Sequence, residues 1–418
     1  MVRTIALLLL SVLLTTACNK TSEKTAQFRG PNRDGIYPGE SLLKKWPAEG
    51  PEEVFYTEGI GHGYGSPVIS RDLLYVTGTV DSTAVLYCYE LSGNKRWDLN
   101  LGPEWVTNYP GSRSAPTIID QLLYTATGFG DLFCISLADS SILWSKSLEN
   151  DFNGPLPRFG HSESPAVHEN MVFWTAGGEE HNVVALDRRT GELLWSSPGK
   201  KERSAYNPPR IITTPSGRNL LLTFSAYHLM ALDAETGELL WTHEQDNYPL
   251  EERQPGYGDT HANTVIYEDN NVYYAAGDGN CGVKLTLDEE GALVGEQWRN
   301  KSFDSYMGGI IKIGQHLYGS GTAKPFLYSI DAASGVLTDS VKIGRGVVIA
   351  ADDMIYFYSQ NGAMHLVSST EGKMESISSF RIQQGTREHF AHPVIDQGIL
   401  YVRHGDVIIG YNIRKEES

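Results

Sequence analysis

An internal repeat of about 50 residues constrains the fold of this chain more than any other feature of the sequence. The segment HSESPAVHENMVFWTAGGEEHNVVALDRRTGELLW, which ends at Trp195, is echoed by YNPPRIITTPSGRNLLLTFSAYHLMALDAETGELLW, which ends at Trp241. Two earlier units end at Trp97 and Trp144. Each unit reads as four apolar strands separated by turns. The chain should therefore be a series of copies of one four-stranded sheet.

The number of copies follows from the large residue in the second strand of each unit. These markers are Tyr75, Tyr124, Phe173, Leu222, Tyr273, Tyr318, Tyr356 and Tyr401. Strands such as LLYVTG and MVFWTAG are apolar at nearly every position, which is typical of sheets covered on both faces. Blades stacked around an axis have both faces covered. The sequence therefore predicts an all-β fold, an eight-bladed β-propeller with four-stranded blades.

The last unit, HFAHPVIDQGILYVRHGDVIIGYNIR, has three strands and lacks its fourth. The missing strand is predicted near the other end of the chain, where EVFYT at 53–57 matches the ELLWS of the middle units and Phe55 stands in the tryptophan position. An N-terminal strand that completes the last blade would close the ring and remove an exposed sheet edge. The propeller is predicted to span residues 44–414.

The N-terminus carries the signs of export. Arg3 is followed by an apolar run from Ile5 to Leu14 and then by Cys18, which predicts a signal peptide over residues 1–17. The residues before Cys18 resemble a bacterial lipobox, so we expect acylation of Cys18 and a lipidated tether over residues 18–43 that includes FRGPNRDG. The alternative is a plain signal peptide cleaved near Ala17. The remaining sequence holds no other apolar run long enough to span a bilayer.

Composition excludes several classes of function. The chain has 51 acidic and 34 basic residues, and so acidic a protein repels nucleic-acid phosphates. Cys88, Cys134 and Cys281 show no CxxC, vicinal or CxxCH spacing, which leaves a disulfide framework, a zinc cluster and attached haem without support. We expect these cysteines to be buried. Asp187 and Asp233, in the turns LDRRTG and LDAETG, are expected to accept backbone hydrogen bonds rather than to act as catalytic acids.

The motif LDxxTGELLW, which occurs at 186–195 and 232–241, resembles the tryptophan-docking repeat of the PQQ-like, quinoprotein alcohol dehydrogenase-like β-propellers. The segments FRGPNRDG, KKWPAEGPEEVFY and DFNGPLPRFGHSESP are similar to a branch of bacterial envelope lipoproteins with such repeats. This superfamily also includes the propeller lipoprotein of the outer-membrane β-barrel assembly machine. The resemblance covers the chain after the signal peptide, although the units at 330–340 and 367–377 have lost the tryptophan.

For an enzyme of this superfamily, the resemblance implies PQQ and calcium above the propeller axis, with the quinone stacked on a vicinal disulfide. This chain has no Cys-Cys pair, and it has no haem motif to carry electrons onward. HExxH, GxSxG and P-loop signatures are absent as well. We therefore expect no catalytic residues and no cofactor, with PQQ and calcium disfavoured and an oxidoreductase kept as the alternative.

The short segments that enter the first strand of each unit are rich in polar side chains. In a closed ring these segments surround one mouth of the central channel, where pockets form. We predict a ligand site there, with no metal, built from His62, Arg113, His161, Glu163, Asp259, His261, Asn263, His389 and His392. Such a set suits an anionic or hydroxyl-rich small molecule, with binding that changes between about pH 5 and 8. The alternative is that these side chains only bond neighbouring blades.

These observations favour a non-catalytic binding or scaffold lipoprotein of the bacterial cell envelope, anchored in the outer membrane and facing the periplasm. Its partners would be envelope proteins or a small polar ligand, bound at a blade edge or at the channel mouth. An oxidoreductase that uses PQQ or a metal is one alternative. The other is a carbohydrate-binding propeller, because aromatic residues lie in the same entry segments, namely Tyr64, Tyr109, Phe159, Tyr206, Tyr257 and Tyr306.

Overall fold

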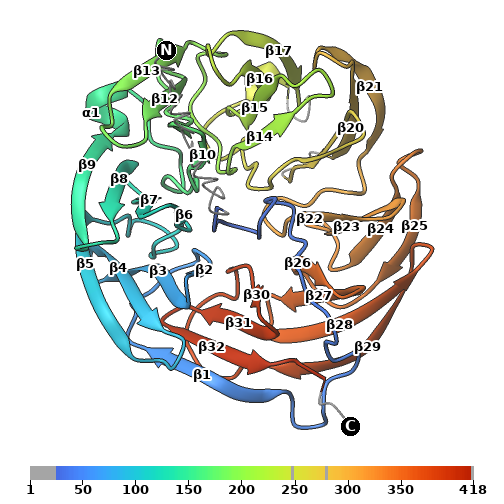
Figure 1. Ribbon diagram of the computed structural model, residues 1–418. Helices are drawn as coiled ribbons and strands as arrows, with labels where there is room; N and C mark the ends of the chain where they lie inside the picture. Colours follow the sequence, from blue (N-terminus) through green and yellow to red (C-terminus); the bar gives the residue numbers. More distant parts are fainter. Residues whose placement is uncertain (1–24, 246–248, 278–280, 416–418) are drawn as a thin grey trace, which may run out of the picture.

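Eight four-stranded antiparallel sheets stand around a central axis in the computed structural model, which describes residues 25–245, 249–277 and 281–415 (Figure 1). The first strand of each blade lies next to the axis and the fourth lies at the outside. The predicted all-β, eight-bladed propeller is confirmed. Among the described residues, no helix is long and apolar enough to cross a membrane.

The first four blades follow one another along the chain. Blade one is β2 (Val68–Ser70), β3 (Leu73–Val80), β4 (Thr83–Glu90) and β5 (Lys95–Pro103). Blade two is β6 (Thr117–Ile119), β7 (Leu122–Ala126), β8 (Asp131–Ser136) and β9 (Ser141–Ser147), followed by α1 (Leu148–Phe152). Blade three is β10 (Ala166–His168), β11 (Met171–Trp174), β12 (Val183–Asp187) and β13 (Leu193–Ser197). Blade four is β14 (Arg210–Thr213), β15 (Asn219–Phe224), β16 (His228–Asp233) and β17 (Leu239–Glu244), followed by the 3-10 turn η1 (Leu250–Glu252).

The second half of the ring repeats this order. Blade five is β18 (Ile266–Glu268), β19 (Asn271–Ala275), β20 (Gly282–Leu287) and β21 (Leu293–Asn300). Blade six is β22 (Ile310–Ile313), β23 (His316–Ser320), β24 (Leu327–Asp331) and β25 (Leu337–Val341). Blade seven is β26 (Gly346–Ala351), β27 (Met354–Ser359), β28 (Ala363–Thr370) and β29 (Lys373–Arg381). Blade eight is β30 (Val394–Asp396), β31 (Ile399–His404), β32 (Val407–Asn412) and β1 (Glu52–Glu58).

Blades three and eight have the same register between their second, third and fourth strands. In blade three, Phe173 lies opposite Ala185, which lies opposite Trp195. In blade eight, Tyr401 lies opposite Gly410, which lies opposite Phe55. Phe55 therefore occupies the tryptophan position, and the predicted closure of the last blade by an N-terminal strand is confirmed.

Four tryptophans join neighbouring blades, because each of their indoles donates to a carbonyl oxygen in the third turn of the next blade, namely Trp144, Trp195, Trp241 and Trp298. Trp195 Nε1 donates to the carbonyl oxygen of Ala234 at 3.1 Å. A Cβ on Gly237 of the same turn would lie 2.4 Å from the Trp195 ring, so only glycine fits there. The carboxylate of Asp233 accepts from the backbone nitrogens of Glu235 and Thr236 at 3.0 Å each, as expected for a turn cap.

Blade seven has no tryptophan of its own, since Ser378 stands in that position. Trp46, from the segment before β1, lies there instead. Its backbone nitrogen donates to Ser378 Oγ at 2.8 Å, and its ring centroid is 5.7 Å from that of Tyr356. Its Nε1 donates to the carbonyl oxygen of Met364 at 3.2 Å. A residue from outside the repeat thus fills the gap that the drifted unit leaves.

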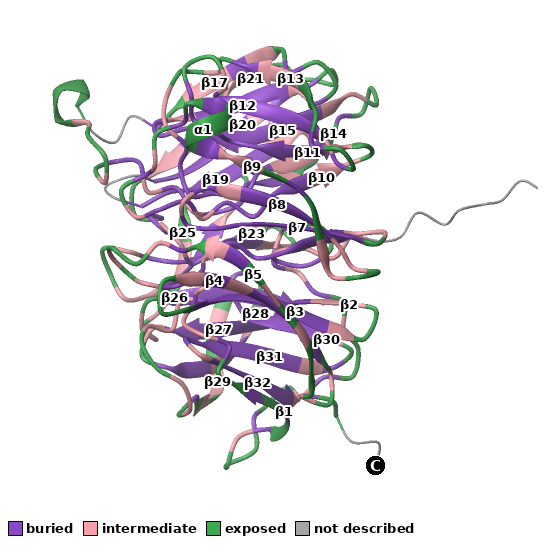
Figure 2. Ribbon diagram, turned by 90° about the vertical axis from the view of Figure 1, so that its left-hand side faces the viewer, coloured by how far each residue is buried: buried purple, intermediate pink, exposed green. Residues whose placement is uncertain are grey.

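The core lies between adjacent blades, where both faces of each sheet are buried (Figure 2). Exposed residues gather in the turns at both ends of the propeller and on the outer strands. Cys88, Cys134 and Cys281 are buried and unpaired, as expected. The predicted signal peptide and Cys18 lie outside the described residues.

Candidate functional site

Residues 26–38 cross the central channel at the end where the first strands of the blades finish, here called the exit end (Figure 1). This segment, the N-terminal arm, bonds to blade two through Ala26 and Ile118, with N–O distances of 2.9 and 2.7 Å. It bonds to blade seven through the nitrogen of Tyr37, which donates to the carbonyl oxygen of Ala350 at 2.8 Å. The predicted tether over residues 18–43 therefore contains a stretch that packs inside the ring.

Arg29 of the arm is fully buried in the channel. Its guanidinium donates to the carbonyl oxygen of Ile310 at 2.6 Å and to that of Val348 at 3.1 Å. It also lies 2.9 Å from Nδ1 of His392. Burial lowers the pKa of Arg29 to about 10, so the group remains charged at neutral pH. One side chain thus ties the arm to blades six, seven and eight.

Arg33 ties the arm to other blades on the opposite side of the channel. Its guanidinium donates to the carbonyl oxygens of Ser164, Pro165 and Pro209, the first at 3.0 Å and the last at 3.2 Å. It also donates to Thr117 Oγ1 at 3.1 Å. Burial lowers its pKa to about 10. Arg33 therefore joins blades two, three and four, and together the two arginines contact six of the eight blades.

The glycines around Arg29 make room for its side chain. A Cβ on Gly309 would lie 1.9 Å from Arg29 Nη1, and a Cβ on Gly35 would lie 2.3 Å from Arg29 Nη2. Gly35 also has a φ of +79°, a conformation that suits glycine. The buried position of Arg29 therefore requires glycine at Gly35 of the FRGPNRDG segment and at Gly309 of the channel wall.

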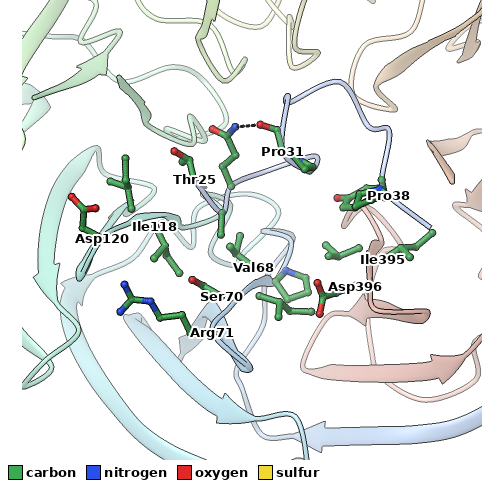
Figure 3. Close-up of a pocket in the computed structure, with 18 residues that line it drawn as sticks. Thr25, Pro31, Pro38, Val68, Ser70, Arg71, Ile118, Asp120, Ile395 and Asp396 are labelled. Carbon is green, nitrogen blue, oxygen red and sulfur yellow. Dashed lines mark hydrogen bonds between the residues drawn. The ribbon is translucent and has the colours of Figure 1, made fainter. Parts of the chain in front are cut away.

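An open pocket of about 360 Å³ lies beside the arm at the exit end (Figure 3). Its walls come from the arm and from the first strands of blades one, two and eight, with Ser70, Arg71, Asp120 and Asp396 among the polar residues. Burial raises the pKa of Asp396, with Asp72 as a second cause. Both signs of charge line this pocket, so its electrostatics favour no single class of ligand.

The predicted site residues lie at the other mouth, here called the entry end. His161 is fully buried, and its Nε2 accepts from Trp174 Nε1 at 3.0 Å. His261 is also buried, and its Nε2 lies 3.0 Å from the carbonyl oxygen of Ala226. The Nδ1 atom of each ring is buried without a hydrogen-bond partner among the described residues. Burial lowers the pKa of His161 to about 3 and that of His261 to about 4.

The other three predicted histidines have different neighbours. His392 is held between Arg29 and the carbonyl oxygen of Met307, 3.1 Å from its Nε2, and burial lowers its pKa to about 3. His389 stacks on His404 with 3.6 Å between ring centroids, and burial lowers its pKa to about 4. His62 is half-buried, and burial lowers its pKa too. Four of the five imidazoles therefore titrate below the range of pH 5 to 8 expected from the sequence, because burial disfavours their charged form.

Glu163 and Asn263 bond backbone groups inside the channel wall. The carboxyl oxygens of Glu163 accept from the backbone nitrogen of Thr175 at 3.1 and 3.2 Å. Burial raises the pKa of Glu163 to about 8, although Arg33 opposes this shift. Asn263 donates to the carbonyl oxygens of Ala275 and Ser305 and accepts from the backbone nitrogen of Gly309 at 2.7 Å. Both side chains thus fasten neighbouring strands.

Asp259 and Arg113 also have bonding partners within the protein. Asp259 forms an ion pair with Arg203, whose Nε lies 2.9 Å from Oδ2. Arg113 donates to the carbonyl oxygens of Asn108, Tyr109 and Gly111, all in its own loop, at 2.7 to 2.9 Å. In the described part of the chain, no hydrogen bond or ion pair joins any two of the nine predicted side chains. They share one end of the propeller without bonding to one another.

Aromatic side chains cover the entry end, and sequence reasoning had noted most of them. Ring centroids are 5.5 Å apart for Tyr64 and Phe390, 6.3 Å for Phe390 and Tyr109, and 6.1 Å for Tyr109 and Phe159. Phe159 lies 6.0 Å from Tyr206. These five residues, the aromatic mouth, come from the entries to blades eight, one, two, three and four. Tyr109 is 50% exposed, Tyr64, Phe159 and Phe390 are partly exposed, and Tyr206 is buried.

A PQQ–calcium pair at the entry end would need metal ligands and cationic side chains. A calcium ion needs several oxygen ligands, yet no group of three His, Cys, Asp or Glu side chains among the described residues could hold a metal ion. The carboxylates of PQQ would need free cations, whereas Arg113 is bonded to three carbonyl oxygens and Arg203 is paired with Asp259. Sequence reasoning missed Arg29, Arg33 and Phe390; the two arginines four positions apart in a glycine-rich segment were the available signal.

A family model described as outer membrane protein assembly factor BamB matches residues 82–337 of the chain. No curated protein sequence matches it.

Solved structures share the fold at low sequence identity. BamB from Moraxella catarrhalis is 14% identical with a TM-score of 0.62, and the match covers 88% of this chain and 99% of that one. A europium-containing methanol dehydrogenase is 11% identical with a TM-score of 0.61, covering 92% and 90% of the two chains. The computationally designed Ika8 protein is 13% identical with a TM-score of 0.53, covering 86% and 99%. An assembly factor, an enzyme and a designed protein thus have this fold, so the fold alone does not select a function.

Proposed function

Because the chain belongs to the family described as outer membrane protein assembly factor BamB, we propose that it is a non-catalytic scaffold protein that binds other proteins of the bacterial cell envelope. We further propose that the protein is anchored through acylated Cys18 and faces the periplasm from the outer membrane. The family description supports a role beside outer-membrane proteins.

The aromatic mouth is the observation that carries the proposal. Tyrosine and other aromatic side chains are enriched at the centres of protein interfaces, where they contribute most of the binding energy. Here they form one contiguous cluster over the channel mouth, where Asp259, Asn263 and Arg113 already bond within the ring. Arg158 lies over the ring of Tyr257 at 5.5 Å, which extends the surface toward blade five. A partner segment docked there would contact the entry loops of several blades at once.

The blade edges are the competing surface. Among the described residues, each outer strand is the last strand of its sheet, and exposed apolar pairs such as Leu193 and Leu194 recur along these strands. Edge strands of this kind can accept an added strand from another chain. The two surfaces face different directions, so crosslinks from each can be told apart.

Site-specific photocrosslinking in cells tests the proposal. A photoreactive residue in place of Tyr109 should crosslink to a discrete envelope protein, and Tyr257→Ser should lower the yield several-fold because it removes a neighbouring aromatic contact. The matched control carries the photoreactive residue in place of Leu194, which is similarly exposed at 49%. Crosslinks from position 194 alone would move the binding surface to the blade edge. No protein crosslink at either position, together with saturable binding of oligosaccharides, would favour the carbohydrate-binding alternative and contradict the scaffold role.

The anchor has its own test. Cys18→Ala should move the protein from the membrane fraction to the soluble periplasmic fraction, because the acyl chains are then absent. A wild-type protein that is already soluble in the periplasm would contradict lipidation.

A further inference from the structure

A second, larger pocket lies between the outer parts of blades six and seven. Its volume is about 620 Å³. One wall is the segment after β25, with Lys342 and Ile343, and the other is the end of β29, with Ser379, Phe380 and Arg381. Figure 1 shows these two outer strands next to each other at the rim. His365 of β28 also lines the pocket.

The charge of this pocket is opposite to that of the whole protein. The chain has a net charge of −17, yet no residue that lines the pocket is acidic. Lys342 is exposed and has no ion pair among the described residues. Arg381 donates from Nη1 to the carbonyl oxygen of Asn361 at 2.7 Å and has no carboxylate partner in the described part of the chain. Two cations thus line one cavity, and neither is neutralised by the protein.

Neutral groups in the pocket add hydrogen-bonding capacity. Nδ1 of His365 is buried and has no hydrogen-bond partner among the described residues. Buried polar atoms of this kind are normally bonded, so His365 lacks a partner that folded proteins usually provide. Ser379 adds a hydroxyl group, and Phe380 and Ile343 supply apolar surface.

We propose that this pocket binds a small oxyanion-bearing ligand, one that carries a phosphate or carboxylate group. The guanidinium of Arg381 has N–H groups left to bind an oxyanion, and the ammonium group of Lys342 adds a second positive charge. The apolar side would accommodate a carbon skeleton. This site is independent of the aromatic mouth and does not rest on the proposed scaffold function.

Calorimetric titration of the full-length protein with inorganic phosphate and with citrate tests the proposal. Each anion should bind with a stoichiometry of one at low ionic strength. The Lys342→Gln/Arg381→Gln variant should bind at least about tenfold more weakly, since both cations are lost. The control is Lys200→Gln/Lys201→Gln, which removes the same charge from an exposed lysine pair outside the pocket and should bind like wild type. Equal melting temperatures would show that both variants are folded.

Binding to lipid vesicles distinguishes an oxyanion on a lipid headgroup from one on a soluble small molecule. Sedimentation with phosphatidylglycerol vesicles but not with phosphatidylcholine vesicles, lost in the Lys342→Gln/Arg381→Gln variant alone, would assign the group to a lipid headgroup. Binding of the free anions without vesicle binding would assign it to a soluble small molecule. If neither the anions nor the vesicles bind, or if the control variant loses binding equally, the proposed site is wrong.

Discussion

At its exit end the channel is filled by the N-terminal arm, a segment outside the repeat, whereas at its entry end it is covered by side chains from the loops of the repeat itself. Arg29 and Arg33 of the arm reach carbonyl oxygens of blades on opposite sides of the axis. Arg113 at the entry end bonds only to its own loop. The arm at the exit end thus bonds blades on opposite sides of the ring, whereas polar contacts at the entry end stay within one loop or join neighbouring blades.

This difference suggests separate roles for the two ends, stability for the exit end and binding for the entry end. Groups that bond several blades at once must stay in place for the ring to remain closed, so the exit end is constrained by folding. Side chains such as Tyr109 contact a few neighbours and face solvent, so they can change without loss of the ring. The entry end is therefore free to carry a binding surface, in keeping with loops that carry function on a rigid scaffold.

The largest effect is expected from the arm. The Arg29→Met/Arg33→Met variant should lower the free energy of unfolding by on the order of 5 kcal/mol, because buried carbonyl oxygens of several blades lose charged hydrogen-bond donors. Chemical denaturation followed by tryptophan fluorescence measures this change.

Arg113→Met is the matched comparison, because it removes a guanidinium with three carbonyl partners from the entry end. It should cost only about 1–2 kcal/mol, since its loop can relax alone. A cost equal to that of the arm variant would show that the two ends contribute equally to stability.

A further effect is expected from acid. Burial lowers the pKa values of His161, His261 and His392 to between about 3 and 4, so between about pH 4.5 and 6.5 these rings take up protons only when the protein unfolds. Glu163, with its pKa raised to about 8, opposes one of them, because it holds a proton in the folded state and releases it on unfolding. The free energy of unfolding should therefore fall by up to about 3 kcal/mol for each pH unit of acidification below pH 6.5. It should also fall, more gently, as the pH rises from 6.5 to 8, because Glu163 then loses its proton.

Urea denaturation at pH 7 and pH 5 measures this dependence for the wild type and for His161→Gln. The glutamine can still accept from Trp174 but does not titrate, so the variant should lose about half of the slope. Equal stability of the wild-type protein at the two pH values would show that these rings are not buried in their neutral form.

Much of the fold could be predicted from the sequence because it depends on local spacing. The eight second-strand markers, the Asp–Gly turns and the match of Phe55 to the tryptophan position each rest on a few neighbouring residues. Trp46 could not be placed in this way. It lies outside every repeat, and only the packed ring shows that it fills the position of Ser378 in blade seven.

For the candidate site, the sequence determined which residues gather at the entry end, because strand order places every entry segment on the same side of a closed ring. It did not determine the contacts or charges of those residues. His161 and Glu163 are neutral at pH 7 because they are buried, and burial depends on the blades around them rather than on the residues beside them in the chain. Arg29 and Arg33 resemble ordinary loop cations in sequence. Only the tertiary structure turns them inward, because the channel presents backbone carbonyl oxygens from several blades, which buried guanidinium groups can bond.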